Sequence, residues 1–326
     1  MINFLLRRVL NAVPTLLLSS ILIFFVIQLA PGDFLTPARL NPNISAERIA
    51  DLQRNLGLDQ PVVVQYWKWL TNMFRGDFGL SFAYNQPVLQ VAWPRIVNSL
   101  YLVLPYFALY YLIAIPLGVY GALRQNSFGD KALNVVMYVL LGFPSFFLAL
   151  LVIFGLVQLR FKTGWDIPIN GLTSDNFTSL SPLGKALDIA KHVAIPALVL
   201  AISDAAGLTR VVRGQMLEYM RADFVRTARS KGVSEFSTVY RHTLRNALVP
   251  IVAGIGSLLP AAISGAGFVE VVFAYPGITP MILDAINSQD LFLIAGFTML
   301  TVFLLIVGNA ISDILLSVVD PRIRYA

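Results

Sequence analysis

Long uncharged stretches dominate this chain of 326 residues. No charged residue occurs between Arg95 and Arg124, and none occurs between Lys131 and Arg160. An α-helix rises about 1.5 Å per residue, so about 20 apolar residues cross the hydrocarbon core of a bilayer. Each interval can therefore hold a tilted spanning helix. Because backbone hydrogen bonds in lipid must be satisfied internally, these runs predict an all-α integral membrane protein.

The composition supports the same class. Hydrophobic residues make up 57% of the chain, charged residues 13%, and the mean hydropathy is +0.72, far more apolar than in a soluble domain. The formal net charge of +6 arises mostly from one loop and indicates no basic surface interleaved with aromatic residues, so we expect no nucleic-acid partner. The chain has no cysteine, which excludes disulfides, thiolate nucleophiles and Cys-ligated metals.

We expect six membrane-spanning helices with both termini in the cytoplasm. The uncharged run Val9–Ala30 has about 22 residues, which exceeds the hydrophobic region of a signal peptide and fits a spanning helix. Arg7 and Arg8 precede it and indicate a cytoplasmic N-terminus. The other spans are expected within 95–124, 131–160, 192–212, 246–269 and 290–313.

Between the first two spans lies a polar stretch that predicts a small helical extracytoplasmic subdomain. Ser45 can cap one helix in it, and Pro61 can open another. The subdomain could bind a partner or only brace the spans, and the residues favour neither. We therefore expect an N-terminal transmembrane helix, this subdomain, a core of five spans and a cytoplasmic tail, at 1–31, 32–97, 98–317 and 318–326 respectively.

Polar residues and helix breakers occur within the expected spans. Asp204 interrupts the fourth span, and a lipid-facing carboxylate costs roughly 2.5–3.5 kcal/mol, so it should face a helix partner or an aqueous path. Ser264 lies among small residues of the fifth span, which favour close helix packing but could also leave room for a solute. Gly142 and Pro144 favour ordinary kinks over a gating hinge.

The strongest charge signal lies between Arg210 and Arg245, where eight Lys or Arg accompany three acidic residues. This excess predicts a cytoplasmic loop, with bounds 214–246. Within it, Asp223 to Lys231 predicts a short helix that ends at Gly232. Ser234 can cap a second helix, whose expected apolar stripe comprises Phe236, Val239, Tyr240 and Leu244.

The residues offer no catalytic centre. The phosphate-binding pattern G-x-x-x-x-G-K-[ST] does not occur, so the chain should not bind ATP by the usual loop. The two histidines, His192 and His242, are expected at opposite membrane faces and cannot form one metal site. No serine lies in a nucleophile-elbow context, which disfavours an intramembrane hydrolase. We expect a non-enzymatic membrane protein without catalytic, cofactor-binding or metal-binding residues.

Several segments resemble one family. The cytoplasmic loop resembles the coupling loop of bacterial ABC-importer permeases, in the version of the dipeptide, oligopeptide and nickel permease family. The general loop begins Glu-Ala-Ala, whereas this chain has Arg226-Thr227-Ala228 and keeps the glycine spacing at Gly232. Phe34 and Val211 depart from the family pattern. The other matching segments are 56–70, 75–82, 208–210, 215–218, 275–278 and 320–325.

The resemblance implies a type I ABC transmembrane fold in a bacterial inner (cytoplasmic) membrane. It implies a second homologous permease subunit, two ATP-binding subunits or domains that hold ATP and Mg²⁺, and an extracytoplasmic solute-binding protein. The implied activity is import of di- or oligopeptides by alternating access. The residues implied to dock in a groove of the ATPase are Asp223, Arg226, Thr227, Ala228, Arg229, Lys231 and Gly232.

Two alternatives stay open. An importer of the same class could carry nickel, glutathione or an oligosaccharide, because the matched segments report coupling rather than cargo. A secondary transporter that needs no ATPase could use Asp204 and Asp313 as proton or ion sites.

Overall fold

The computed structural model is mostly helical. It describes residues 2–29, 35–40, 42, 44–56, 59–81, 83–165, 167–249, 251 and 266–319. The helices form two compact units that divide within helix α5 (Val88–Leu123), between Ser99 and Leu100.

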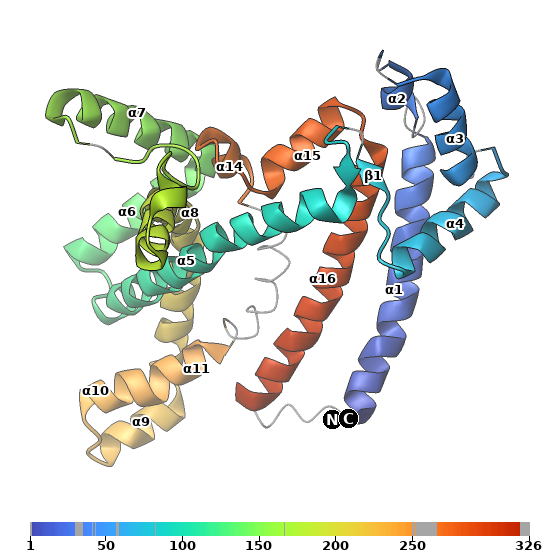
Figure 1. Ribbon diagram of the computed structural model, residues 1–326. Coiled ribbons are helices and arrows are strands. Elements are labelled where there is room, and N and C mark those ends of the chain that lie inside the picture. The colour runs from blue at the N-terminus through green and yellow to red at the C-terminus, as the bar shows by residue number, and fades with distance from the viewer. Residues whose placement is uncertain are drawn as a thin grey trace. The chain divides into compact units, whose positions relative to one another are not determined.

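The first unit is built around two long helices, α1 (Ile2–Gln28) and α16 (Leu291–Val319). They lie side by side and run in opposite directions, so the start of α1 and the end of α16 lie at the same end of the pair (Figure 1). The other elements of this unit are α2 (Thr36–Leu40), α3 (Ala46–Leu56), α4 (Val62–Phe74), strands β1 (Leu80–Ser81) and β2 (Gln86–Pro87), and α15 (Ile278–Asn287).

Local sequence rules explain the short helices of the first unit. The Ser45 hydroxyl accepts a hydrogen bond from the Arg48 amide at 3.2 Å, which confirms the predicted cap of α3. Pro61 precedes the first residue of α4, also as predicted. On α4, Tyr66 and Leu70 are buried against Phe24 of α1, and the Tyr66 hydroxyl lies 2.8 Å from Ser20 Oγ. This contact fixes α4 along α1.

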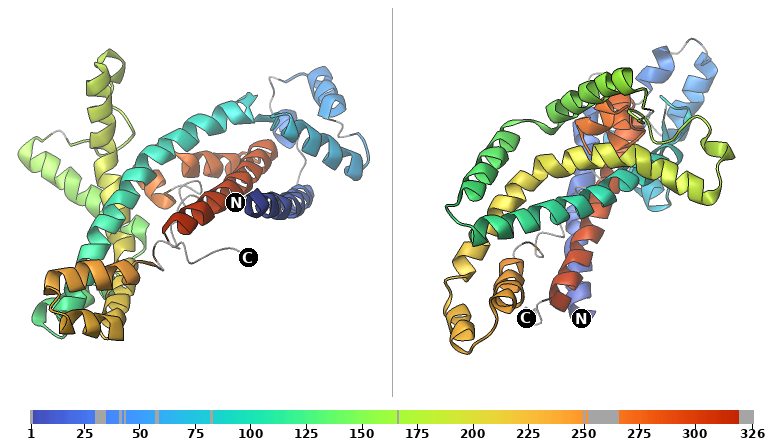
Figure 2. Two further views of the ribbon diagram at one scale, coloured as in Figure 1. Left: turned by 90° about the horizontal axis from the view of Figure 1, so that it is seen from below. Right: turned by 90° about the vertical axis from the view of Figure 1, so that its left-hand side faces the viewer.

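The second unit contains the rest of α5 and a set of helices packed around α8 (Pro182–Tyr219). Figure 2 shows α8 running between the loop after α7 and the short helices that follow it. The most apolar segment of α8 is 44% buried, whereas that of α7 is 6% buried. Helix α8 is therefore the central helix of the unit, and α7 is a peripheral one. The other elements are α6 (Phe128–Gly142), α7 (Ser145–Thr163), η1 (Phe177–Ser179), α9 (Asp223–Ser230), α10 (Glu235–Ser237), η2 (Thr238–Leu244), α11 (Arg245–Ala247) and α14 (Phe268–Val272).

The third expected span is not one helix. Helix α6 ends at Gly142, Phe143 is extended at φ −100° and ψ 126°, and Pro144 precedes α7. A residue before proline avoids the helical conformation, so Pro144 produces a break here rather than the kink we expected. Only α7 of the two is long enough to cross a membrane.

Helix α8 starts earlier than expected. We expected a loop up to Lys191, but Ser181 accepts a hydrogen bond from the Gly184 amide at 3.2 Å, and Pro182 occupies the first helical position. Both are ordinary start signals. Among the described residues, four helical segments have the length and hydropathy to span a membrane, namely α5, α7, α8 and Leu291–Ala310 of α16. Most of the expected fifth span, with Ser264, lies outside the described residues.

Candidate functional site

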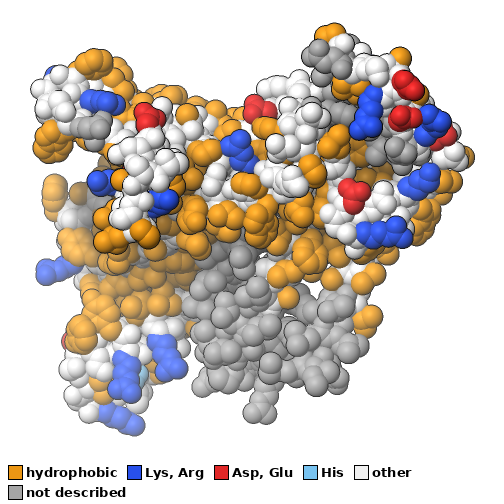
Figure 3. Space-filling view, in the orientation of Figure 1, with side chains coloured by type: hydrophobic (Ala, Val, Ile, Leu, Met, Phe, Trp, Pro, Cys, Tyr) orange, Lys and Arg blue, Asp and Glu red, His pale blue; other side chains and the backbone are white. Residues whose placement is uncertain are grey.

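Helix α9 presents most of its surface to solvent. Val225 is 0% and Ala228 8% exposed, and these two side chains face inward. The remaining residues of the expected docking set are all exposed, namely Asp223, Arg226, Thr227, Arg229, Lys231 and Gly232. Lys and Arg side chains gather over α9 and the segment that follows, at the lower left of Figure 3. The expected set therefore lies on α9 and the two residues after it, and its Ala228 side chain faces inward.

The turn after α9 has the geometry of a glycine-terminated helix. Gly232 lies at φ +78°, in the left-handed region. Its amide donates to the Arg229 carbonyl, and the Val233 amide donates to the Ala228 carbonyl at 3.2 Å. This pair of hydrogen bonds satisfies carbonyls that the last helical turn leaves free. The predicted stop at Gly232 is confirmed.

An ion pair joins the two sides of this turn. Arg229 Nη2 lies 2.6 Å from Glu235 Oε1, and Arg229 Nε lies 3.1 Å from Glu235 Oε2. These two parallel hydrogen bonds raise the pKa of the Arg229 guanidinium. Ser234 accepts a hydrogen bond from the Ser237 amide, which confirms its predicted capping role. We call residues 223–247 the coupling hairpin, after the coupling loop that this segment resembles in sequence.

The second half of the coupling hairpin departs from the α-helix we expected. Residues Thr238–Leu244 form a π-helix, and the Thr243 hydroxyl donates to the Thr238 carbonyl at 3.0 Å. The extra residue per turn changes which side chains face inward. Thr238, Val239 and Thr243 are buried, whereas Phe236 and Tyr240 are 74% and 44% exposed. The predicted apolar stripe is therefore wrong for Phe236 and Tyr240.

The coupling hairpin packs on the C-terminal half of α8. Val239 and Ala247 share a buried cluster with Val212 and Met216 of α8, and Ala114 of α5 belongs to the same cluster. Burial of such side chains contributes roughly 25 cal/mol per Å² of apolar area. The coupling hairpin and α8 therefore share one packed apolar cluster.

A second ion pair, which the sequence analysis did not single out, ties α8 to the start of α6. Arg213 Nε and Nη2 each lie 2.8 Å from one carboxylate oxygen of Asp130. Asp130 is 2% exposed and also accepts a hydrogen bond from the Asn126 amide. The Arg213 hydrogen bonds hold the pKa of Asp130 below its usual value. The two residues lie far apart in the sequence, so no local pattern pairs them.

Asp204 has a helix partner. It lies on α8, and the Tyr106 hydroxyl of α5 donates to Asp204 Oδ2 at 2.7 Å. The carboxylate is nevertheless exposed, between buried Ser203 and Ala205. The expected helix partner of Asp204 is therefore Tyr106 of α5, and the expected aqueous path stays a prediction.

In the first unit, Asp290 braces the hairpin formed by β1 and β2. Asp290 is 0% exposed, and its carboxylate accepts hydrogen bonds from the Ser81 hydroxyl and the Ala83 amide. Its other oxygen accepts from the Leu293 amide at 3.0 Å and so caps α16. This part of the polar segment therefore braces a long helix.

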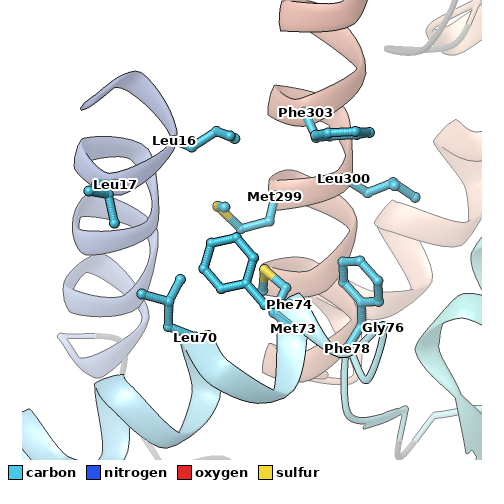
Figure 4. Close-up of a pocket in the computed structure, with 10 residues that line it drawn as sticks. All are labelled: Leu16, Leu17, Leu70, Met73, Phe74, Gly76, Phe78, Met299, Leu300 and Phe303. Carbon is cyan, nitrogen blue, oxygen red and sulfur yellow. The ribbon is translucent and has the colours of Figure 1, made fainter. Parts of the chain in front are cut away.

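A cavity of about 360 Å³ lies between α1, α4 and α16 of the first unit (Figure 4). Its walls are hydrocarbon and thioether groups, such as Leu17, Met73 and Phe303. Such mostly apolar walls offer little to orient a polar solute. Among the described residues, no group of three His, Cys, Asp or Glu side chains could hold a metal ion.

Comparison with known proteins gives a consistent family assignment. Residues 114–325 match the family described as the binding-protein-dependent transport system inner membrane component, and residues 1–103 match its N-terminal component. The oligopeptide transport system permease protein AppB of Bacillus subtilis is 37% identical over 326 residues, covering 100% of both chains. The glutathione transport system permease protein GsiC of Salmonella paratyphi A is 32% identical over 328 residues, again covering 100% of both chains. The chain therefore belongs to the inner-membrane components of binding-protein-dependent transport systems, the permease subunits of ABC importers.

Proposed function

We propose that this permease subunit translocates di- or oligopeptides. Support for this cargo comes from AppB, a full-length relative that is named as an oligopeptide transport permease. The observation that carries the coupling role is the coupling hairpin, in which α9 exposes a charged face while its turn is fixed by Gly232 and the Arg229–Glu235 ion pair.

The proposed partners follow from the family. A binding protein is implied by the family description, and the assembly would add a second homologous permease and two ATP-binding subunits or domains. ATP and Mg²⁺ would bind to those ATPases, and this chain would contribute no catalytic residue. The proposed docking set lies on α9 and the two residues after it, and it comprises Asp223, Arg226, Thr227, Ala228, Arg229, Lys231 and Gly232.

The proposed topology has six spans with both termini in the cytoplasm, and it keeps the boundaries 1–31, 32–97, 98–317 and 318–326. The antiparallel packing of α1 and α16 supports it, because the ends of this helix pair that lead to the two termini lie together. In alternating access, closure of the ATPases would displace α9, and the packing of the hairpin on α8 would pass that displacement into the membrane.

Purification in mild detergent tests this assembly. The tagged chain should recover an ATPase with a Walker loop, and Arg226→Glu with Lys231→Glu should abolish that recovery by reversing charges on the exposed face of α9. Arg54→Glu, on exposed α3, is the matched control and should leave recovery unchanged. Recovery of the chain alone, together with ATP-independent uptake in vesicles, would contradict the proposal.

Glutathione is a second candidate cargo, because GsiC is also a full-length relative and is named for glutathione transport. Uptake of labelled tripeptide and of labelled glutathione by the reconstituted importer separates the two. The peptide proposal expects faster tripeptide uptake, and exclusive uptake of glutathione would replace it.

A further inference from the structure

Asp204 and Tyr106 lie near the middle of two long helices. Asp204 is close to the centre of α8 (Pro182–Tyr219), and Tyr106 is at the centre of α5 (Val88–Leu123). Both helices have the length and hydropathy to span a membrane. We therefore expect the pair to lie within the membrane, where a charged group is costly and usually has a functional reason.

The carboxylate is only half satisfied within the described chain. Tyr106 donates to Oδ2, while Oδ1 has no hydrogen-bond donor among the described residues. The nearest basic residue on α8, Arg210, lies over the Tyr138 ring at 4.8 Å and is engaged there. Asp204 therefore offers a free oxygen and an unneutralised negative charge on its exposed side.

Aromatic rings stand beside this charge. The Tyr106 and Tyr110 rings have centroids 5.9 Å apart, and the Phe107 ring lies 4.6 Å from that of Tyr106. Aromatic faces attract cations, and the attraction strengthens where water is excluded. A carboxylate beside such rings suits an ammonium group better than an anion or a neutral polar group.

We propose that Asp204, Tyr106 and Tyr110 form a site in the translocation pathway for the ammonium group of a peptide. The inference rests on the proposed function, because it names the part of the peptide that the permease itself contacts. Lipid contact is disfavoured, because a carboxylate that faces lipid at this depth is costly. An open, aqueous side removes that cost, and a bound ammonium group would replace the water.

The absence of cysteine from the chain permits a direct test. Gly207 lies one turn after Asp204 on the same face of α8, and a Cβ added there meets no atom within 4 Å. A Gly207→Cys variant of the assembled importer, in membranes, would be labelled with a cationic trimethylammonium-ethyl and an anionic sulfonatoethyl thiosulfonate. Leu104→Cys, on an exposed apolar part of α5, is the lipid-facing control and should not react.

We expect Gly207→Cys to react faster with the cationic reagent. Adding Asp204→Asn should lower the ratio of cationic to anionic rates about tenfold, because one nearby charge is lost. Asp204→Glu should restore most of the ratio. Absence of labelling at Gly207→Cys, or a ratio that Asp204→Asn leaves unchanged, would overturn the site. A basic residue of a partner subunit against Asp204 would produce one of these two results.

Protection links the site to the peptide. Trialanine should slow the labelling of Gly207→Cys, and N-acetyl-trialanine, which lacks the ammonium group, should slow it several-fold less. Equal protection by both peptides would overturn the assignment of the ammonium group. Failure of the proposed function has a different signature, because the wild-type importer would then take up no peptide although labelling kept its charge preference.

Discussion

At the scale of single residues, Gly232 shows how one backbone conformation shapes the candidate site. Its φ of +78° lets the chain reverse directly after α9, and its space is open, since an added Cβ would meet nothing within 4 Å. A side chain at this position is therefore disfavoured by backbone strain alone. The reversal of the chain after α9 therefore uses a backbone conformation that favours glycine.

Gly232→Ala should reduce transport per ATP hydrolysed while leaving membrane insertion intact. The left-handed conformation costs a residue with a Cβ about 1–2 kcal/mol, which is enough to open the turn. Transport and ATPase rates of the reconstituted importer measure the ratio. Gly214→Ala adds the same methyl group in open space within α8 and is expected to leave coupling unchanged. Normal coupling in Gly232→Ala would contradict the lever role of the turn.

Substitutions can separate two roles of Arg229, namely holding the coupling hairpin through Glu235 and docking to the ATPase. If Arg229 only holds the hairpin through Glu235, then Arg229→Ala and Glu235→Ala should reduce coupling equally, and the double variant should add nothing. We expect Arg229→Ala to be worse, because its exposed face also belongs to the docking set. The ratio of transport to ATP hydrolysis, measured for the three variants, separates the two roles. Identical losses would reassign Arg229 as a positioning residue alone.

At the scale of elements, the ion pair between Asp130 and Arg213 holds the start of α6 against α8. Asp130 and Arg213 are paired in bidentate geometry, and Asp130 is almost fully buried. A buried charge that loses its partner destabilises a fold more than the pair itself stabilises it. The pair therefore holds the start of α6 to α8 just before the coupling hairpin.

Asp130→Asn should lower the free energy of unfolding by about 2 kcal/mol at neutral pH, the magnitude of a hydrogen bond to a charged group. Because the pKa of Asp130 is lowered in the folded state, its contribution is present above the unfolded value of about 3.9 and is lost as the pH falls through the folded value. The difference in melting temperature between the wild-type protein and Asp130→Asn should therefore persist down to about pH 4 and disappear below it. Asp51→Asn, in an exposed pair with Arg54, should change little at any pH. A gap independent of pH would contradict this assignment.

Elements were predictable where a local rule decides them. Ser45, Gly232 and Ser234 act as the sequence indicated, because caps and left-handed turns depend on a few neighbouring residues. The π-helix at Thr238–Leu244 was missed, since the apolar spacing also fits an α-helix. The Asp130–Arg213 pair was missed because tertiary packing alone brings the two residues together.

At the scale of the whole molecule, the two long helices of the first unit predict the side of the membrane on which the two termini lie. The antiparallel pair α1 and α16 has the start of one beside the end of the other (Figure 1). Reporter domains fused to either terminus should therefore both show cytoplasmic activity. A reporter inserted after Asn176, in the loop between α7 and α8, should show extracytoplasmic activity. Termini reported on opposite sides would contradict six spans.

The continuity of α8 has a mechanical consequence. From Asp204 to the end of the helix at Tyr219 the rod is about 22 Å long, at 1.5 Å per residue. A tilt of about 10° about that end would move the carboxylate by about 4 Å, whereas hydrogen-bond lengths vary by only about 0.5 Å. Pressure on the coupling hairpin that tilts α8 would therefore break the hydrogen bonds of Asp204. A group that Asp204 binds in one orientation of α8 would be released in the other orientation.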